Sequence, residues 1–192
     1  MLRRDFLKHS ALAGATAALS SSLSASALGS DANAKKIAIV SQTADETDYV
    51  KALERFENVE RVVALGTDRL ENFNTIVSLI EENRGSVLFG MVEPSDYLLL
   101  NQVMGSFNAK WINETAHMPI DGGTRHSETS SAHLSLKTAF SHLDPSADHS
   151  YGHLISSYHA IGSHPSVSVS KEGDFLSSHA AKNPFVSFVI KA

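Results

Sequence analysis

Residues 86–92 read Ser-Val-Leu-Phe-Gly-Met-Val. Because nearly every position is apolar, this stretch is typical of a β-strand that is buried on both faces, as in a parallel sheet. Apolar runs at residues 35–40 and 59–65 predict two strands before it, and residues 109–113 predict a fourth strand after it. The first half of the chain is therefore expected to supply the strands of a buried sheet.

Helical spacing of apolar side chains separates these strands. Residues 45–56 and 70–80 each show it, and a third helix is expected to run from a cap at Ser95 or Asp96 to about Phe107. A strict alternation of strand and helix is typical of a parallel sheet with helices packed on it. The expected fold class is α/β, with a small three-layer parallel-sheet unit in the order β-α-β-α-β-α-β.

The second half of the chain, residues 117–192, has a different composition, because it holds nine of the ten histidines and is dense in serine. Its expected elements are helices at 130–140 and 151–161, an irregular loop at 119–131, and a terminal antiparallel pair of strands at 165–170 and 184–190, connected through 171–174. We therefore expect one domain over residues 35–192, in which a regular unit (35–116) is followed by a His/Ser-rich segment that packs on it.

The overall composition excludes several classes of protein. The chain has 192 residues, of which 42% are hydrophobic and 19% charged, and a formal charge of −5, whereas a dedicated nucleic-acid binder normally carries a basic surface. The sequence contains no cysteine, which excludes disulfides, cysteine-ligated metal centres, c-type haem attachment, a cysteine nucleophile and a lipoprotein anchor.

Residues 1–34 have the features of a cleavable export signal: a charged start, a weakly apolar middle, and an end of small residues. The order Arg3-Arg4-Asp5-Phe6-Leu7-Lys8 closely resembles the twin-arginine (Tat) signal pattern Arg-Arg-x-Phe-Leu-Lys. This resemblance implies export of the folded chain by the Tat translocase to the periplasm. The middle stretch is too short and too polar for a permanent membrane anchor. Cleavage is expected after Ala34, or alternatively after Ala27.

Four polar loops follow the four expected strands, and ligands of open parallel sheets bind at the carboxyl ends of the strands. The loops are Ser41-Gln42-Thr43, Gly66-Thr67-Asp68, Glu93-Pro94-Ser95-Asp96 and Glu114-Thr115-Ala116-His117. Polar residues at these places can also serve only to cap helices. The usual nucleotide and nucleophile-elbow motifs, G-x-G-x-x-G, G-x-x-x-x-G-K-[ST] and G-x-S-x-G, do not occur in the sequence.

Two groups of residues are candidates for chemistry. Glu114 and His117 end the fourth expected strand, and a carboxylate that orients an imidazole can form an acid–base pair; the alternative is that His117 only caps the strand end. On a helix, His149 and His153 would share a face, with Asp148 beside them. Two imidazoles and one carboxylate can bind Zn, Cu, Ni or Fe, so a transition metal is a candidate cofactor.

The histidines also allow three other interpretations: dispersed surface or hydrogen-bonded side chains, bis-histidine haem ligation, and pH sensing. Residues 117–192 contain five Lys/Arg and six Asp/Glu, so their net charge is −1 with neutral histidines and +8 with all nine protonated. An ordinary imidazole titrates near about pH 6.5. Binding of an acidic partner by this half would therefore tighten on acidification.

Together these patterns predict an exported periplasmic binding or accessory protein, whose partner is a small molecule, a metal or a redox complex and not a nucleic acid. The first alternative is a small periplasmic hydrolase or lyase with a Glu/His or metal-assisted site at the strand ends. The second alternative is an interaction module without a ligand.

Overall fold

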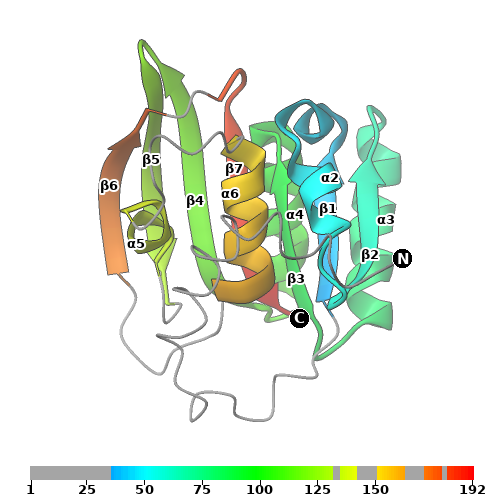
Figure 1. The fold of residues 1–192 in the computed structure, drawn as a ribbon. Helices are drawn as coiled ribbons and strands as arrows, with labels where there is room; N and C mark the ends of the chain where they lie inside the picture. The colour runs from blue at the N-terminus through cyan, green and yellow to red at the C-terminus, as the bar shows by residue number, and fades with distance from the viewer. Residues whose placement is uncertain (1–35, 132–134, 142–150, 163–170, 179–180) are drawn as a thin grey trace, which may run out of the picture.

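The computed structural model describes residues 36–131, 135–141, 151–162, 171–178 and 181–192, which form one seven-stranded mixed sheet with helices on both faces (Figure 1). The strands are β1 (Lys36–Ser41), β2 (Val59–Leu65), β3 (Val87–Val92), β4 (Lys110–Ile120), β5 (Gly123–Ser130), β6 (Lys171–Ser177) and β7 (Phe185–Lys191). The helices are α2 (Tyr49–Leu53), α3 (Arg69–Glu82), α4 (Pro94–Ser106), α5 (Leu136–Ser141) and α6 (Tyr151–Ser157). Their order in the sheet is β2-β1-β3-β7-β4-β5-β6.

The first three strands confirm the expected parallel arrangement. β1 lies between β2 and β3 and is parallel to both. Every residue of β3 is buried, as its apolar sequence predicts. The helix expected over residues 45–56 is shorter, because a 3₁₀ segment (Gln42–Thr47) precedes α2, and Asp48 between them has a left-handed backbone with φ of 59°.

The second half of the sheet corrects the expected layout. β7 inserts between β3 and β4 and is antiparallel to both, so β4 runs in the same direction as β3 without touching it. Both edges of β7 are therefore occupied, by β3 and β4. Residues 165–170, the expected partner of the last strand, lie outside the described residues. The expected connection at 171–174 is instead part of β6, which pairs with β5.

The prediction of an irregular loop at residues 119–131 is also wrong, because most of these residues belong to a β-hairpin. β4 extends to Ile120, β5 begins at Gly123, and Asp121-Gly122 forms the turn. Gly122 has a φ of 81°, a backbone conformation that favours glycine. The helix expected at 130–140 is reduced to α5, while α6 begins at Tyr151 as expected and continues into a π-helical turn (Tyr158–Gly162).

The two faces of the sheet carry two separate apolar cores. α3 and α4 cover one face, where Ile76 and Leu100 pack on Ile37 and Leu88. On the other face α2 and α6 contribute Tyr49, Leu53, Tyr151 and Ile155. In Figure 1, α2, α5 and α6 lie on the side of the sheet that faces the viewer, and α3 and α4 lie behind it. Among the helices of the described part, none is long and apolar enough to cross a membrane.

Candidate functional site

A pocket of about 440 Å³ opens at the carboxyl ends of β1, β2 and β3. It is lined by Ser41, Gln42, Thr43, Gly66, Thr67, Arg69, Asn72, Glu93, Ser95 and Asp96. We call it the strand-end pocket. Three of the four polar loops expected to converge therefore do so, because the strands that carry them are neighbours in the sheet.

Ser41 ties the pocket floor together. Its hydroxyl donates to Oδ2 of Asp96 at 2.5 Å and accepts the backbone N–H of Glu93 at 2.8 Å. Beside it, the hydroxyl of Thr43 donates to Oε1 of Glu93 at 2.7 Å. The last residue of β1 thus fixes the loop that leads from β3 into α4.

Asn72 of α3 holds the third loop in place. Its side-chain amide exchanges two hydrogen bonds with the backbone of Gly66, both of 3.0 Å, and donates to Oδ1 of Asp96 at 3.1 Å. Both oxygens of Asp96 are therefore occupied, and its side chain is only 6% exposed. The expected cap of α4 at Ser95 or Asp96 is wrong. The helix begins after Glu93, and no side chain caps its first turn.

The pocket presents groups of both charges to a ligand. Glu93 uses one carboxylate oxygen for Thr43, and Arg69 stands exposed at the first position of α3. Every lining residue is polar or glycine. The arrangement suits a small, highly polar molecule that is held by hydrogen bonds and charge.

The structure does not bring Glu114 and His117 together. Glu114 pairs with Phe188 and is hydrogen-bonded to the Tyr97 hydroxyl, on the face covered by α4. His117 pairs with Phe185, on the face covered by α6. Residues three apart in a strand point to opposite faces, so these two cannot form the expected acid–base pair. Neither lines the strand-end pocket, because β7 separates β4 from β3.

Of the three expected metal ligands, only His153 lies within the described residues; His149 and Asp148 do not. His153 is half-buried on α6. Within the part of the chain that the structure describes, no group of three or more His, Asp or Glu residues is arranged to hold a metal ion.

A chain of hydrogen bonds joins β7, β4, β5 and β6, and its members could not be named from the sequence, which allowed hydrogen-bonded histidines only as a general interpretation. Nδ1 of His117 lies 2.8 Å from Nδ1 of His126, and both rings are fully buried. Nε2 of His117 lies 2.8 Å from the Ser187 hydroxyl, and Nε2 of His126 lies 2.9 Å from the Ser177 hydroxyl. We call this chain the histidine relay. Burial lowers the pKa of His117 well below its usual value, and the nearby His126 and His159 add to the effect.

A third buried histidine, His159, lies in the π-helical turn. Its Nδ1 is 2.6 Å from the hydroxyl of Tyr49 on α2. Burial, together with Lys36, lowers the pKa of His159 to about 3. Lys36 is itself buried, donates to the backbone oxygen of Ala160 at 2.7 Å, and has its pKa lowered to about 8 by burial. These contacts anchor the π-helical turn to α2 and β1.

Glu128 of β5 is a further buried charged group on this face of the sheet. Its carboxylate accepts the backbone N–H groups of Leu136 and Lys137, at 2.6 and 3.0 Å, and the side-chain amide of Asn113 at 2.8 Å. Burial raises the pKa of Glu128, and these hydrogen bonds oppose the rise. Glu128 therefore acts as the N-terminal cap of α5.

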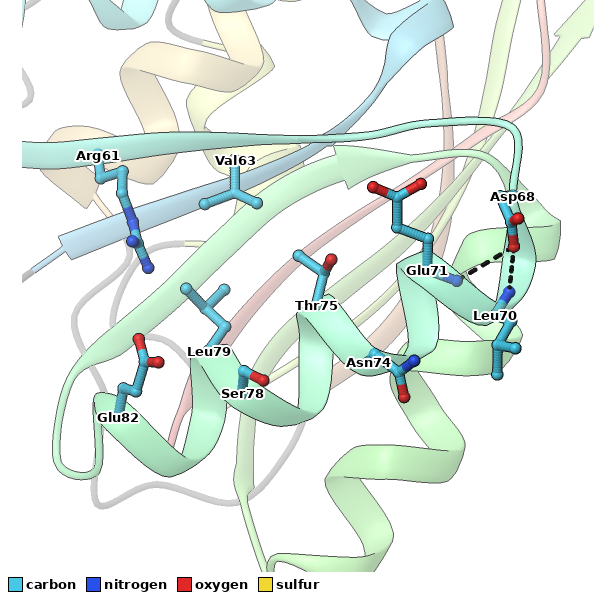
Figure 2. A pocket seen from close by; sticks show the side chains of 10 residues that line it. All are labelled: Arg61, Val63, Asp68, Leu70, Glu71, Asn74, Thr75, Ser78, Leu79 and Glu82. Carbon is cyan, nitrogen blue, oxygen red and sulfur yellow. Dashed lines mark hydrogen bonds between the residues drawn. The ribbon is translucent and has the colours of Figure 1, made fainter.

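A second hollow, of about 570 Å³, lies between β2 and α3 (Figure 2). Arg61 and Val63 point from β2 toward α3, and Glu71 points back toward β2. Among the ten residues drawn, the hydrogen bonds join only Asp68 to the backbone N–H groups of Leu70 and Glu71, which caps α3. This hollow, the β2–α3 groove, lacks the convergent side chains of the strand-end pocket.

Comparison of the chain with protein-family models, with curated proteins and with solved structures finds no match. The strand-end pocket is the more suitable binding site, because its polar groups converge from three loops and are held by hydrogen bonds.

Proposed function

We propose that this chain is an exported protein that binds a small polar molecule in the strand-end pocket. The observation that carries the proposal is the network in which Ser41, Asn72 and Asp96 hold three loops around one opening. Side chains fixed by their own hydrogen bonds lose little freedom when a ligand binds, which favours affinity. The pocket volume lies within the range of about 300–1,000 Å³ that is common for small-molecule sites.

The lining indicates the class of ligand. Glu93 attracts a cationic or hydrogen-bond-donating group, and Arg69 attracts an anionic group. The hydroxyls of Thr67 and Ser95 can donate or accept hydrogen bonds, and that of Thr43, which donates to Glu93, can still accept one. A zwitterion such as an amino acid, or an amino sugar, combines these features, whereas a large apolar ligand finds no complementary surface.

Export is the second part of the proposal, and it is supported by the twin-arginine pattern at residues 3–8. Proteins that use the Tat translocase cross the membrane already folded, and many of them acquire a ligand or partner beforehand. We propose the periplasm as the place where the pocket acts. The alternative ligand, a transition metal, would be held by His149, His153 and Asp148, of which His149 and Asp148 lie outside the described residues.

The proposal is tested by thermal denaturation of the purified chain in the presence of amino acids, amino sugars, polyols and divalent metals. A ligand at about 100 times its Kd should stabilise the fold by about 2.7 kcal/mol, which is a readily measured rise in Tm. Glu93→Gln and Arg69→Met should each weaken that binding tenfold or more.

The matched controls are Glu82→Gln and Thr75→Val, which alter the β2–α3 groove and should leave the affinity unchanged. If Glu93→Gln binds the ligand as tightly as the wild type, or if the groove variants lose it, the strand-end pocket is not the site.

A further inference from the structure

The histidine relay has an unusual proton balance. Each Nδ1 of His117 and His126 faces the other at 2.8 Å, and a hydrogen bond at that distance needs one proton between the two atoms. One ring must therefore carry its proton on Nδ1 and the other on Nε2. The flanking hydroxyls of Ser187 and Ser177 satisfy both arrangements, because a hydroxyl can donate to one Nε2 and accept from the other.

Added protons are poorly tolerated by this buried pair. The first added proton binds the unprotonated Nε2, which leaves the Nδ1–H···Nδ1 bond in place but gives the buried pair a positive charge. The next added proton makes both rings imidazolium, and the two Nδ1–H groups then point at each other. Both rings are fully buried, so water cannot solvate that charge without movement of the elements that cover them. The relay is therefore stable while both rings are neutral and share one Nδ1 proton, and it is destabilised when the rings become charged.

The elements over the relay pack on it through their aromatic rings. Tyr151 of α6 lies edge-on to His117 at 5.5 Å and stacks on His126 at 6.0 Å between ring centres. Phe140 of α5 lies 5.0 Å from His126, and Phe175 of β6 stacks on it at 4.4 Å. The Tyr151 hydroxyl makes no hydrogen bond within the described residues, so withdrawal of α6 breaks no such bond at this hydroxyl.

Among the described residues, few charged groups can compensate an added positive charge on the rings. The titratable groups on the surrounding elements are the tyrosines Tyr49, Tyr151 and Tyr158, the histidines His153 and His159, the lysines Lys36 and Lys137, the carboxylate of Glu128, and the exposed Arg125–Asp174 ion pair on β5 and β6. His159 adds to the lowering of the His117 pKa, and the buried cation Lys36 in turn lowers the pKa of His159. Glu128 is the buried carboxylate of this set, and its charge is committed to the cap of α5.

The relay also has the connectivity of a serine nucleophile, a base and an orienting group. However, Ser187 and His117 are fully buried, and neither lines the strand-end pocket or the β2–α3 groove. A substrate carbonyl cannot reach the Ser187 hydroxyl while α6 is in place. The geometry fits a proton-controlled contact better than a catalytic one.

We infer that the His117–His126 pair is an acid-operated latch, which holds α5 and α6 on the sheet while both rings are neutral and releases them when the rings become protonated to imidazolium. The inference does not depend on the ligand of the strand-end pocket. The face that the latch opens is the opposite one from that of α3 and α4, so we expect those helices to remain packed at acidic pH.

The first experiment is hydrogen–deuterium exchange of the full chain between pH 7.5 and 4.5, corrected for intrinsic exchange rates. On acidification, protection of residues 136–141 and 151–162 should fall at least tenfold more than protection of α3 and α4, which follows only the fall in global stability. His126→Asn keeps a hydrogen-bonding group near Nδ1 but cannot be protonated, and it should remove most of that loss. Equal loss in both helical layers, or an unchanged loss in His126→Asn, would overturn the latch.

Two matched variants separate the latch from its neighbours. His153→Asn removes a half-buried histidine of the same helix and should keep the full acid response. Glu128→Gln should also keep it; if Glu128→Gln abolishes the response, the cap of α5 and not the histidine pair is the sensor.

Should a variant fail to fold, nitrogen NMR of the wild-type imidazoles decides: one protonated Nδ1 is expected at pH 7.5, and two imidazolium rings are expected below the transition. Two rings that both carry the proton on Nε2 at pH 7.5 would contradict the shared proton.

Discussion

Ser41 and Asp96, which are 55 positions apart, are joined by a hydrogen bond of 2.5 Å that links the end of β1 to the first turn of α4. Ser41→Ala removes this donor and also the acceptor for the backbone N–H of Glu93. Because Asp96 is buried, the loss should destabilise the fold by about 1–3 kcal/mol in urea denaturation. Ser95→Ala, in the same pocket, is the matched control and should change stability by less than about 0.5 kcal/mol. Equal effects of the two variants would mean that the bond contributes little.

Glu128 gives a second prediction, because it accepts three hydrogen bonds at the start of α5. Glu128→Ala leaves three donors without this partner and should lower the free energy of unfolding by about 3 kcal/mol. Glu128→Gln keeps one acceptor oxygen and removes a buried charge, so it should lower it by less than half as much. Urea denaturation at pH 7.5 measures both. An equal loss in the two variants would show that the charge, and not the acceptor, stabilises α5.

The parallel half of the sheet could be predicted because its information is local. β1, β2 and β3 are apolar runs between helical patterns, and each lies where the sequence indicated it. β5 was missed for a physical reason: its inward side chains are Thr124, His126, Glu128 and Ser130, all buried although polar. Apolar periodicity does not detect a strand whose buried face is held by hydrogen bonds. The Asp121-Gly122 turn was the available signal for this hairpin.

The candidate site was likewise predictable only where it depends on the three parallel strands. The loops after β1, β2 and β3 meet because those strands are neighbours, whereas the loop expected to end at His117 does not join them. The reason is that β7, from the end of the chain, inserts beside β3. No local pattern encodes such a long-range pairing. The opposite directions of Glu114 and His117 follow from the length of β4, which continues seven residues beyond the expected Asn113.

Gly90 offers a test of the packing between β1 and β3. A Cβ at this position would lie 1.8 Å from the backbone oxygen of Ile39, closer than any real contact. Gly90→Ala should therefore prevent stable folding or destabilise the protein by more than about 4 kcal/mol. Gly105→Ala is the matched control, because a Cβ there meets nothing within 4 Å inside α4. It should stabilise the protein by about 0.5–1 kcal/mol. Circular dichroism during thermal denaturation distinguishes the two; a stable Gly90→Ala would contradict the strand register.

The twin-arginine pattern predicts a specific export defect. Replacing Arg3 and Arg4 by lysine keeps the charge but removes the paired guanidinium groups that the motif requires. The double variant should accumulate in the cytoplasm with its first residues intact, whereas the wild type should reach the periplasm shortened to begin at Lys35 or, with the alternative cleavage, at Leu28. Cell fractionation and N-terminal sequencing measure this. A variant with Lys8 changed to Arg is the control and should be exported. Export of the double variant at the wild-type level would exclude the Tat route.

The buried histidines predict how global stability depends on pH. Burial lowers the pKa of His159 to about 3 and that of His117 well below its usual value, so both rings are neutral in the folded chain at pH 6. In the unfolded chain each takes up a proton near about pH 6.5. Below that value the unfolded state binds more protons, so the free energy of unfolding falls as the pH falls, by up to about 1.4 kcal/mol per pH unit for each histidine. Above about pH 7.5 these two groups should contribute no pH dependence.

Urea denaturation at pH 7.5, 6.5, 6.0 and 5.5 measures the slope, which should approach about 2.7 kcal/mol per pH unit when both histidines contribute. His159→Gln should remove about half of it, since the remaining titration belongs to His117. His153→Gln is the control, because this half-buried side chain should leave the slope unchanged. A free energy of unfolding that stays constant between pH 7.5 and 5.5 would mean that these imidazoles are solvated in the folded chain, contrary to their complete burial.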